Sequence, residues 1–373
     1  MTKQAISLLV FSALITGCAG GNGSSLPGAI QANSARSGIT AQSAVVHGNF
    51  TEYTLPAGAH PSDFTRGPYS TLWFHSPPGQ GTHAIAYRFS EGNGTTTAYT
   101  LGNMYPSYST GITSTGGYVY FFADDPFYSE NNVYLVRVNN AGTFTVYPDY
   151  QGDSPIFNLT VGSDGKLWYP FCVEACGQYG NGDYVAGTPV NSGSNLAVQL
   201  PGYTAQYVSP GPNGDIYATA TNSAPPAGVQ AAVFVISTSG KILHQFALPD
   251  DSVPFGIVTG SDHNLWIAES GTNKIAKMNP TTGATTQYSV PTAGAEPTVI
   301  TYGYDLALWF VETHANKIAR ITTSGSVTEY SIPTANSGAN AIQPCDTTTC
   351  SPHGGVWFTE QTANKIGKFK SPL

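Results

Sequence analysis

The chain reads Leu-Trp-Ile-Ala-Glu at residues 265–269, Asn-Lys-Ile-Ala-Lys at 273–277 and Thr-Gln-Tyr-Ser-Val-Pro at 286–291. The same pattern returns as Leu-Trp-Phe-Val-Glu at 308–312, Asn-Lys-Ile-Ala-Arg at 316–320 and Thr-Glu-Tyr-Ser-Ile-Pro at 328–333. A third copy begins with Val-Trp-Phe-Thr-Glu at 356–360 and Asn-Lys-Ile-Gly-Lys at 364–368. Repeats with a period of about 40–50 residues are typical of propellers and other stacked arrays. The C-terminal third of the chain therefore predicts a repeat fold.

The tryptophan of this pattern has weaker equivalents upstream, at spacings of 43 to 49 residues. With them the chain contains seven aromatic anchors: Trp73, Tyr120, Trp168, Tyr217, Trp266, Trp309 and Trp357. Most anchors follow a turn such as Gly-Ser-Asp-Gly at 162–165, which supplies the positive φ angles that hairpins need. Each unit is therefore expected to form four antiparallel strands, with its anchor packed between units. Seven such sheets in a ring predict an all-β, seven-bladed β-propeller.

The two ends of the propeller are predicted to meet in one blade. The last copy of the pattern stops after its third strand, and its fourth strand should read Thr-Glu-Tyr followed by Pro. Residues 51–56 read Thr-Glu-Tyr-Thr-Leu-Pro. We therefore expect this strand to complete the seventh blade and close the ring. The alternative is that it begins another blade, which would leave the seventh blade with an unpaired edge.

The composition favours short strands and excludes two classes of partner. The chain has 373 residues, with 42 Gly and 26 Pro, and turn-forming residues at this density favour many strands joined by tight turns. Its 14 Lys and Arg are spread thinly and the net charge is −8. Nucleic acids and anionic lipid headgroups are bound by clustered basic residues, so neither is an expected partner. We expect a monomer that binds a small molecule, a glycan or a protein at one face of the ring.

The N-terminus predicts export and lipid attachment. Residues 1–17 combine Lys3 with an apolar stretch too short to span a bilayer, as in a cleaved signal peptide. They end in Leu-Ile-Thr-Gly before Cys18, which resembles a bacterial lipobox and makes Cys18 the lipidated residue; an ordinary secretory signal is the alternative. Residues 18–45 are rich in Gly, Ser and Ala and are interpreted as a flexible linker. The propeller is then expected over 46–373, outside the cytoplasm on the outer membrane or cell surface.

Four cysteines remain beyond the lipobox, and they form two local pairs. Cys172 lies four residues before Cys176, and Cys345 lies five residues before Cys350. In an exported protein an even number of cysteines indicates disulfides, and local pairing is the simplest arrangement. A zinc site built from all four cysteines is the alternative. Bridges this short hold loops in place more than they hold the ring together.

The repeated pattern resembles the virginiamycin B lyase (streptogramin lyase) family, most closely over residues 253–370. The resemblance implies a seven-bladed propeller that opens the ring of streptogramin B antibiotics by elimination, with Mg²⁺ as the metal. It also implies catalytic histidines on inner strands of the last two blades, facing the channel. At the channel-facing positions of the seven blades this sequence has Ser62, Thr110, Phe157, Gln206, Phe255, Thr298 and Asn340. None of these side chains can act as a base near neutral pH.

Three other residues are weak candidates for catalysis. Glu296 keeps the carboxylate that flanks the expected histidine position, and His60 is its counterpart in the first blade. His353 precedes the last anchor, but at a turn position. No metal site or cofactor is expected unless the protein is a lyase of this family, in which case it would require Mg²⁺. The sequence therefore predicts a binding module without lyase activity; the alternatives are a carbon–oxygen lyase with a relocated base and a surface-structural repeat protein.

Overall fold

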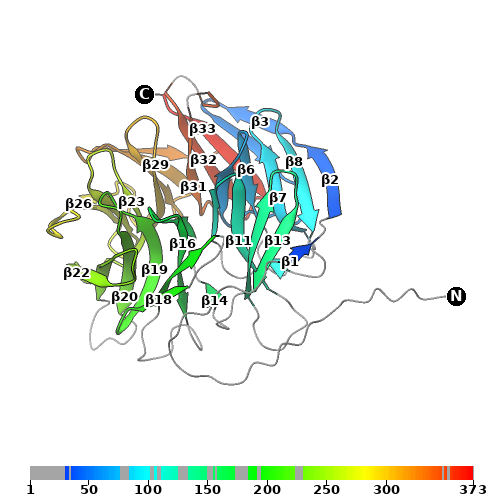
Figure 1. Ribbon diagram of the computed structural model, residues 1–373. Helices are drawn as coiled ribbons and strands as arrows, with labels where there is room; N and C mark the ends of the chain where they lie inside the picture. The colour runs from blue at the N-terminus through cyan, green and yellow to red at the C-terminus, as the bar shows by residue number, and fades with distance from the viewer. Residues whose placement is uncertain are drawn as a thin grey trace.

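The structure is a computed structural model, and it describes the following residues: 30–32, 35–75, 84–100, 105–106, 111–124, 133–148, 154–155, 158–172, 184–190, 195–222, 230–346, 348–350 and 353–372. Within these ranges every regular element is a β-strand, and the strands form seven antiparallel sheets. The sheets are the seven blades of a β-propeller, as the repeat predicts (Figure 1). No helix in the described part of the chain is long and apolar enough to cross a membrane.

Blades 4, 5 and 6 are regular four-stranded sheets. Blade 4 consists of β19 (Tyr203–Pro210), β20 (Ile216–Asn222), β21 (Ala231–Ile236) and β22 (Ile242–Leu248). Blade 5 consists of β23 (Pro254–Thr259), β24 (Leu265–Glu269), β25 (Lys274–Met278) and β26 (Thr285–Ser289). Blade 6 consists of β27 (Pro297–Tyr302), β28 (Leu308–Glu312), β29 (Lys317–Ile321) and β30 (Val327–Ser331).

Blades 1, 2 and 3 follow the same strand order with less regular inner strands. Blade 1 consists of β5 (Phe64–Gly67), β6 (Thr71–Phe74), β7 (Ala84–Ser90) and β8 (Thr95–Thr100). Blade 2 consists of β9 (Tyr105–Pro106), β10 (Ile112–Thr115), β11 (Tyr118–Asp124), β12 (Val133–Asn139) and β13 (Phe144–Pro148). Blade 3 consists of β14 (Ser154–Pro155), β15 (Thr160–Val161), β16 (Lys166–Cys172), β17 (Tyr184–Pro189) and β18 (Leu196–Gln199). In blades 2 and 3 the innermost strand is split into two short pieces that pair with the same neighbour.

The seventh blade confirms the predicted ring closure. It combines β31 (Ile342–Cys345), β32 (Gly355–Glu360) and β33 (Lys365–Lys370) with the N-terminal strand β4 (Phe50–Thr54). Strands β4 and β33 pair antiparallel, with Phe50 opposite Phe369 and Thr54 opposite Lys365. Figure 1 shows the blue N-terminal strands beside the red C-terminal strands. Segments more than 300 residues apart in sequence therefore share one sheet.

Three further N-terminal strands lie wholly or partly within residues 18–45, where the sequence predicts a linker. Strand β1 (Ile30–Ala32) pairs with β13, β2 (Ala35–Ala41) pairs with β8, and β3 (Ala44–His47) pairs with β4. Each becomes the outermost strand of its blade, in blades 2, 1 and 7 respectively. The outer edge of a blade presents unpaired backbone groups, which accept a strand whatever its side-chain pattern. Residues 30–45 are therefore not all linker, while residues 18–29 lie outside the described residues.

The aromatic anchors are core residues. All seven have side chains that are at most 2% exposed. The indole nitrogens of Trp168, Trp266 and Trp309 each donate a hydrogen bond of 3.1 Å to an aspartate in the preceding turn. A Cβ atom on Gly260 would come within 2.7 Å of the Trp266 ring, which explains the glycine that opens this turn. The anchor therefore packs between blades and also fixes the hairpin that precedes it.

Candidate functional site

The inner strands of the blades converge on a central channel that contains two cavities. The larger has a volume of about 220 Å³ and the smaller about 210 Å³. Four residues line both cavities: Asp63, Asn158, Tyr207 and Val299. They come from the inner segments of four different blades. Because these residues line both cavities, the two cavities adjoin at this point of the channel.

The larger cavity contains most of the sequence-predicted channel positions that the structure describes. Ser62, Phe255, Thr298 and Asn340 all line it. Thr110 and Phe157 lie outside the described residues. Gln206 lines neither cavity, which departs from the prediction. The pairing of β19 with β20 skips a residue between Ala205 and Tyr207, and the Gln206 amide instead donates to the Thr221 hydroxyl at 3.1 Å. Tyr207, the next residue in β19, lines the larger cavity in blade 4.

Asp63 is the functional candidate that sequence reasoning missed. It follows Ser62 directly, and the backbone amide of Phe64 donates to its Oδ1 at 2.7 Å. Burial raises the pKa of the Asp63 carboxyl to about 8, against the opposing effect of backbone hydrogen bonds. Burial, and then the negative charge of Asp63, raise the pKa of the Tyr207 hydroxyl as well. One feature of the sequence could have indicated it. Asp63 lies ten residues before its anchor, and at the equivalent positions blades 5 and 6 have the uncharged residues Gly256 and Val299.

Neighbouring hydrogen bonds fix the shape of this site. Asn158 clamps β19 just after its bulge: its Nδ2 donates to the carbonyl of Val208 at 2.8 Å, and its Oδ1 accepts from the amide of Val208 at 2.9 Å. The hydroxyls of Thr298 and Thr313 lie 2.9 Å apart. By contrast, the hydroxyl of Ser62 is buried and has no hydrogen-bond partner among the described residues. Buried polar groups are nearly always paired, so this unpaired hydroxyl indicates a place for a ligand or water.

The three weak catalytic candidates lie outside both cavities. Oε1 of Glu296 lies 2.9 Å from Nδ1 of His314, and both side chains are largely exposed. His60 uses its Nδ1 to contact the carbonyl of Gln361 at 2.8 Å, which ties blade 1 to blade 7. His353 is exposed just before β32. The structure therefore does not bring these three residues together around the channel.

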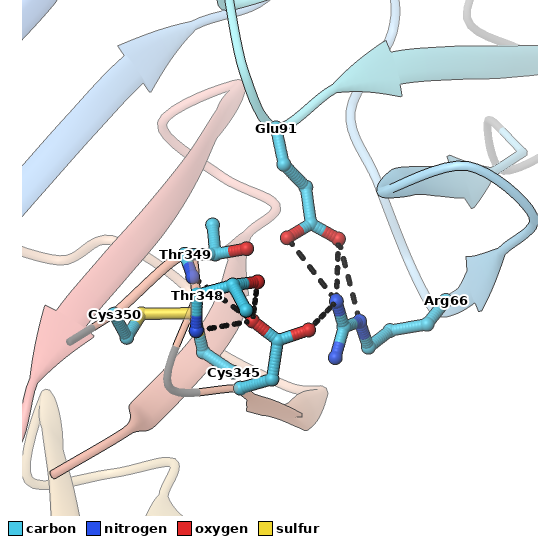
Figure 2. Close-up of a disulfide and its surroundings, with 7 residues drawn as sticks. Arg66, Glu91, Cys345, Thr348, Thr349 and Cys350 are labelled. Carbon is cyan, nitrogen blue, oxygen red and sulfur yellow. Dashed lines mark hydrogen bonds and ion pairs between the residues drawn. A yellow bond between two sulfur atoms is a disulfide. The ribbon is translucent and has the colours of Figure 1, made fainter. Parts of the chain in front are cut away.

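One predicted disulfide is present and belongs to a contact between blades 1 and 7. Cys345 and Cys350 are bonded, so these two cysteines do not form a zinc site. Figure 2 shows the guanidinium of Arg66 between Glu91 and the loop that carries this disulfide. Arg66 lies 3.3 Å from the Glu91 carboxylate and 2.8 Å from that of Asp346. Burial acts to raise the pKa of Asp346, but hydrogen bonds from Thr348 and Arg66 outweigh it and hold that pKa well below its usual value.

The second predicted disulfide falls outside the part of the chain that the structure describes. Cys172 ends strand β16, but Cys176 is not among the described residues. Among the residues that are described, no three His, Cys, Asp or Glu side chains gather in a way that could hold a metal ion. Pairing of Cys172 with Cys176 stays a prediction.

Solved structures support the propeller fold. The chain is similar to a streptogramin B lyase, with a TM-score of 0.65 and 24% identity over 86% of this chain and 96% of that one. It is also similar to a catalytically inactive His-to-Ala variant of virginiamycin B lyase from Staphylococcus aureus with quinupristin, with a TM-score of 0.67 and 24% identity over 86% of this chain and 99% of that one. A protein from Lactobacillus plantarum gives a TM-score of 0.57 with 14% identity over 81% of this chain and 97% of that one. At these identities the likeness establishes the fold alone.

The family assignment comes from the sequence itself. No curated protein matches the chain. The family model described as the virginiamycin B lyase family matches residues 186–372, which is half of the chain and includes all of blades 4, 5 and 6. This region contains all three copies of the repeated pattern, in which a Trp is followed seven residues later by Asn-Lys-Ile. The chain belongs to the virginiamycin B lyase family.

Proposed function

We propose that this protein is a ligand-binding member of its family, which takes a small molecule into the central channel and does not open streptogramin rings. The observation that carries the proposal is the chemistry of the larger cavity. The positions at which the family resemblance implies histidines are Thr298 and Asn340, whose side chains do not accept a proton near neutral pH. Ser62 and Asp63 nevertheless present a hydroxyl and a carboxyl to this cavity.

The size of the cavity limits what can enter it. Pockets for drug-sized ligands typically measure about 300–1,000 Å³. The larger cavity alone is below that range, at about 220 Å³; with the adjoining cavity of about 210 Å³ the channel reaches only the lower part of the range. The channel therefore suits a small molecule, or one protruding group of a larger molecule, better than an enclosed macrocyclic antibiotic.

A lyase with a relocated base is the second candidate, and one observation favours it. A general base works best when its pKa lies near the working pH, and the pKa of Asp63 is raised to about 8. Asp63 is thus the residue to which a displaced catalytic base would be assigned. Mg²⁺ would have to bind beside it, and Asp63 is the single carboxylate in the described lining of the two cavities.

An assay of streptogramin B linearisation with Mg²⁺, with and without a chelator, separates these two candidates. We expect no turnover by the wild-type protein above background. Loss of a general base typically reduces the rate by about 10²–10⁴-fold, and both implied histidine positions lack one. The variant Thr298→His/Asn340→His places imidazoles at those positions. It tests in the same assay whether restoring them creates lyase activity.

Turnover by the wild-type protein at enzyme-like rates would refute the binding-module proposal. Asp63→Asn then identifies the base, because this change removes the titrating group and keeps its size. Glu296→Gln is the matched control, since Glu296 is a family-like carboxylate that lies outside both cavities. Equal loss in both variants would indicate a general effect on folding and would leave Asp63 unassigned as the base.

We further propose that the protein is exported and tethered to the cell envelope by a lipid on Cys18. The lipobox-like sequence at residues 14–18 supports this, and the Cys345–Cys350 disulfide suits an oxidising compartment. Cys18→Ser is expected to release the protein from membranes or leave its signal peptide uncleaved. Cell fractionation and the mass of the mature protein measure this, with Ser24→Ala as a control. Unchanged fractionation and maturation of Cys18→Ser would rule out the lipoprotein proposal.

A further inference from the structure

We propose that the channel ligand is a small organic cation, specifically a primary alkylammonium whose charge is balanced by Asp63 and whose N–H groups bond to Asp63 and Ser62. This inference rests on the proposed ligand-binding function and names the chemical class of the ligand. Three independent features of the larger cavity support it: its charge, its hydrogen-bonding groups and its aromatic surface.

The first feature is a carboxyl group without a positive partner. Asp63 lines the smaller cavity together with Ile112 from β10, Tyr207 from β19 and Val299 from β27. In the described lining of the two cavities there is no Lys, Arg or His, and Tyr207 is the one other side chain that can titrate. An ionised carboxylate in this setting is costly unless a cation accompanies it. When Asp63 is ionised, the channel therefore holds one negative charge that the described lining residues leave unbalanced.

The second feature is the hydroxyl of Ser62, which is adjacent in sequence to this carboxyl. Ser62 is only 4% exposed, and its Oγ has no hydrogen-bond partner among the described residues. It lines the same cavity as Asp63. A primary ammonium has three N–H donors and no acceptor, so it would satisfy both a carboxylate and a hydroxyl oxygen. A neutral alcohol could satisfy the hydroxyl but would leave the charge of Asp63 unbalanced.

The third feature is an aromatic surface on the same cavity. The rings of Tyr207 and Phe255 have centroids 5.8 Å apart and planes inclined at 52°. Both residues line the cavity with Ser62 and Asp63. Aromatic faces attract organic cations and also bury the methylene groups attached to them. The pair therefore complements both parts of an alkylammonium ion.

Binding of such a cation must displace a proton. Because burial raises the pKa of Asp63 to about 8, most copies of the free protein are protonated there at pH 7. The cation binds the ionised form, so the proton leaves to solvent as the complex forms. Affinity should then rise about ninefold from pH 6 to 7 and about fivefold from pH 7 to 8, and level off above that. An alkylammonium itself loses its proton only near a pH of about 10, as lysine does.

Isothermal titration calorimetry of the full chain with n-butylammonium, at pH 6, 7, 8 and 9, tests this proposal. Butan-1-ol is the neutral probe of matched length. Titrations at pH 7 in two buffers of different ionisation enthalpy count the protons released, and we expect close to one per cation bound. We expect Asp63→Asn to abolish both the preference for the cation and the pH dependence. Glu296→Gln, which changes an exposed carboxylate outside the channel, should bind like the wild type.

The outcomes distinguish this inference from the proposed function beneath it. If both probes bind equally well at every pH, and both are lost in Thr298→Trp, the channel is a ligand site but the cation inference is wrong. If the cation binds and Asp63→Asn binds it equally well, the charge is balanced elsewhere and the inference is also wrong. If neither probe binds the wild-type protein up to its solubility limit, both the inference and the small-molecule function of the channel are refuted.

Discussion

Deleting the chain through Pro56 is expected to lower the melting temperature by more than about 10 °C. The deletion removes Phe50 and Leu55, which are 8% and 4% exposed. Phe50 packs against Phe369 with ring centroids 4.6 Å apart. Losing a buried Phe or Leu side chain typically costs about 2–5 kcal/mol each, and 1 kcal/mol corresponds to roughly 2–4 °C for a large domain. The deletion also exposes the edge of β33 to solvent.

A polar contact between blades 6 and 7 is lost with the same strand. Glu52 in β4 is buried, and its carboxylate accepts hydrogen bonds from the Thr334 amide at 3.1 Å and the Thr334 hydroxyl at 2.8 Å. Lys365 donates to the same carboxylate at 3.1 Å. Without Glu52, Lys365 loses its ion-pair partner within blade 7, and Thr334 of blade 6 loses the carboxylate that it contacts across the blades. Ring closure therefore depends on charge as well as on apolar burial.

The informative control for this deletion ends at Ser43. It removes β1 and β2 but keeps β3 and β4, so blade 7 stays complete. If residues 18–43 were only linker, this deletion would have no effect; the pairing of β1 with β13 and of β2 with β8 predicts a small decrease in melting temperature. Differential scanning calorimetry of the two truncations gives the comparison. Equal melting temperatures would mean that strand β4 contributes nothing to closure.

The fold could be predicted from the sequence because each repeated residue makes the same local contacts in every blade that contains it. Asn316 of the Asn-Lys-Ile pattern has a positive φ of 54°, and its side chain accepts from the Ser337 amide and donates to the Thr334 carbonyl, both at 2.9 Å. Asn273 and Asn364 make the equivalent contacts in their own blades. A residue needed at the same place in every unit leaves a period in the sequence. That period predicts the blades and even the closing strand.

The candidate site was only partly readable because its chemistry is not repeated. Counting from the anchors found Ser62, Phe255, Thr298 and Asn340, which do line the cavity. In blade 4 the cavity is lined by Tyr207, one residue beyond the counted Gln206, and counting alone does not tell which of two adjacent residues on an irregular inner strand faces the cavity. Asp63 was missed for a different reason. Its significance arises from burial at the centre of the ring, where seven distant segments meet, and no local pattern encodes that burial.

Two other buried carboxyls predict how the stability of the ring depends on pH. Glu312 and Glu360 end the second strands of blades 6 and 7, and both are completely buried. Burial, and then the nearby charges of Glu329 and Glu52, raise the pKa of each to about 8. Blade 5 offers an internal comparison, because Gln287 replaces the second carboxylate there and donates to Glu269 at 2.6 Å. The pKa of Glu269 is raised less, to about 7.

The sign of the effect follows from proton linkage. An unfolded glutamate ionises near pH 4.3, whereas Glu312 and Glu360 stay protonated in the folded protein until about pH 8. Between these values the folded state binds more protons than the unfolded state, so the free energy of unfolding decreases as pH rises. The stabilising contribution is complete below pH 4.3, is lost progressively up to about pH 8, and does not change further above it. The limiting slope is about 1.4 kcal/mol per pH unit for each group.

The variant Glu312→Gln/Glu360→Gln should therefore flatten the stability profile on the alkaline side. Glutamine is neutral at every pH and has nearly the shape of the protonated acid, so the variant keeps the packing and loses the titration. Urea unfolding at pH 5 and pH 8 should show that the variant gains several kcal/mol relative to wild type between these two values, because two groups each contribute up to the limiting slope. Glu296→Gln, at an exposed site, should run parallel to wild type. Parallel curves for the double variant as well would show that Glu312 and Glu360 ionise in the folded protein as easily as they do in the unfolded chain.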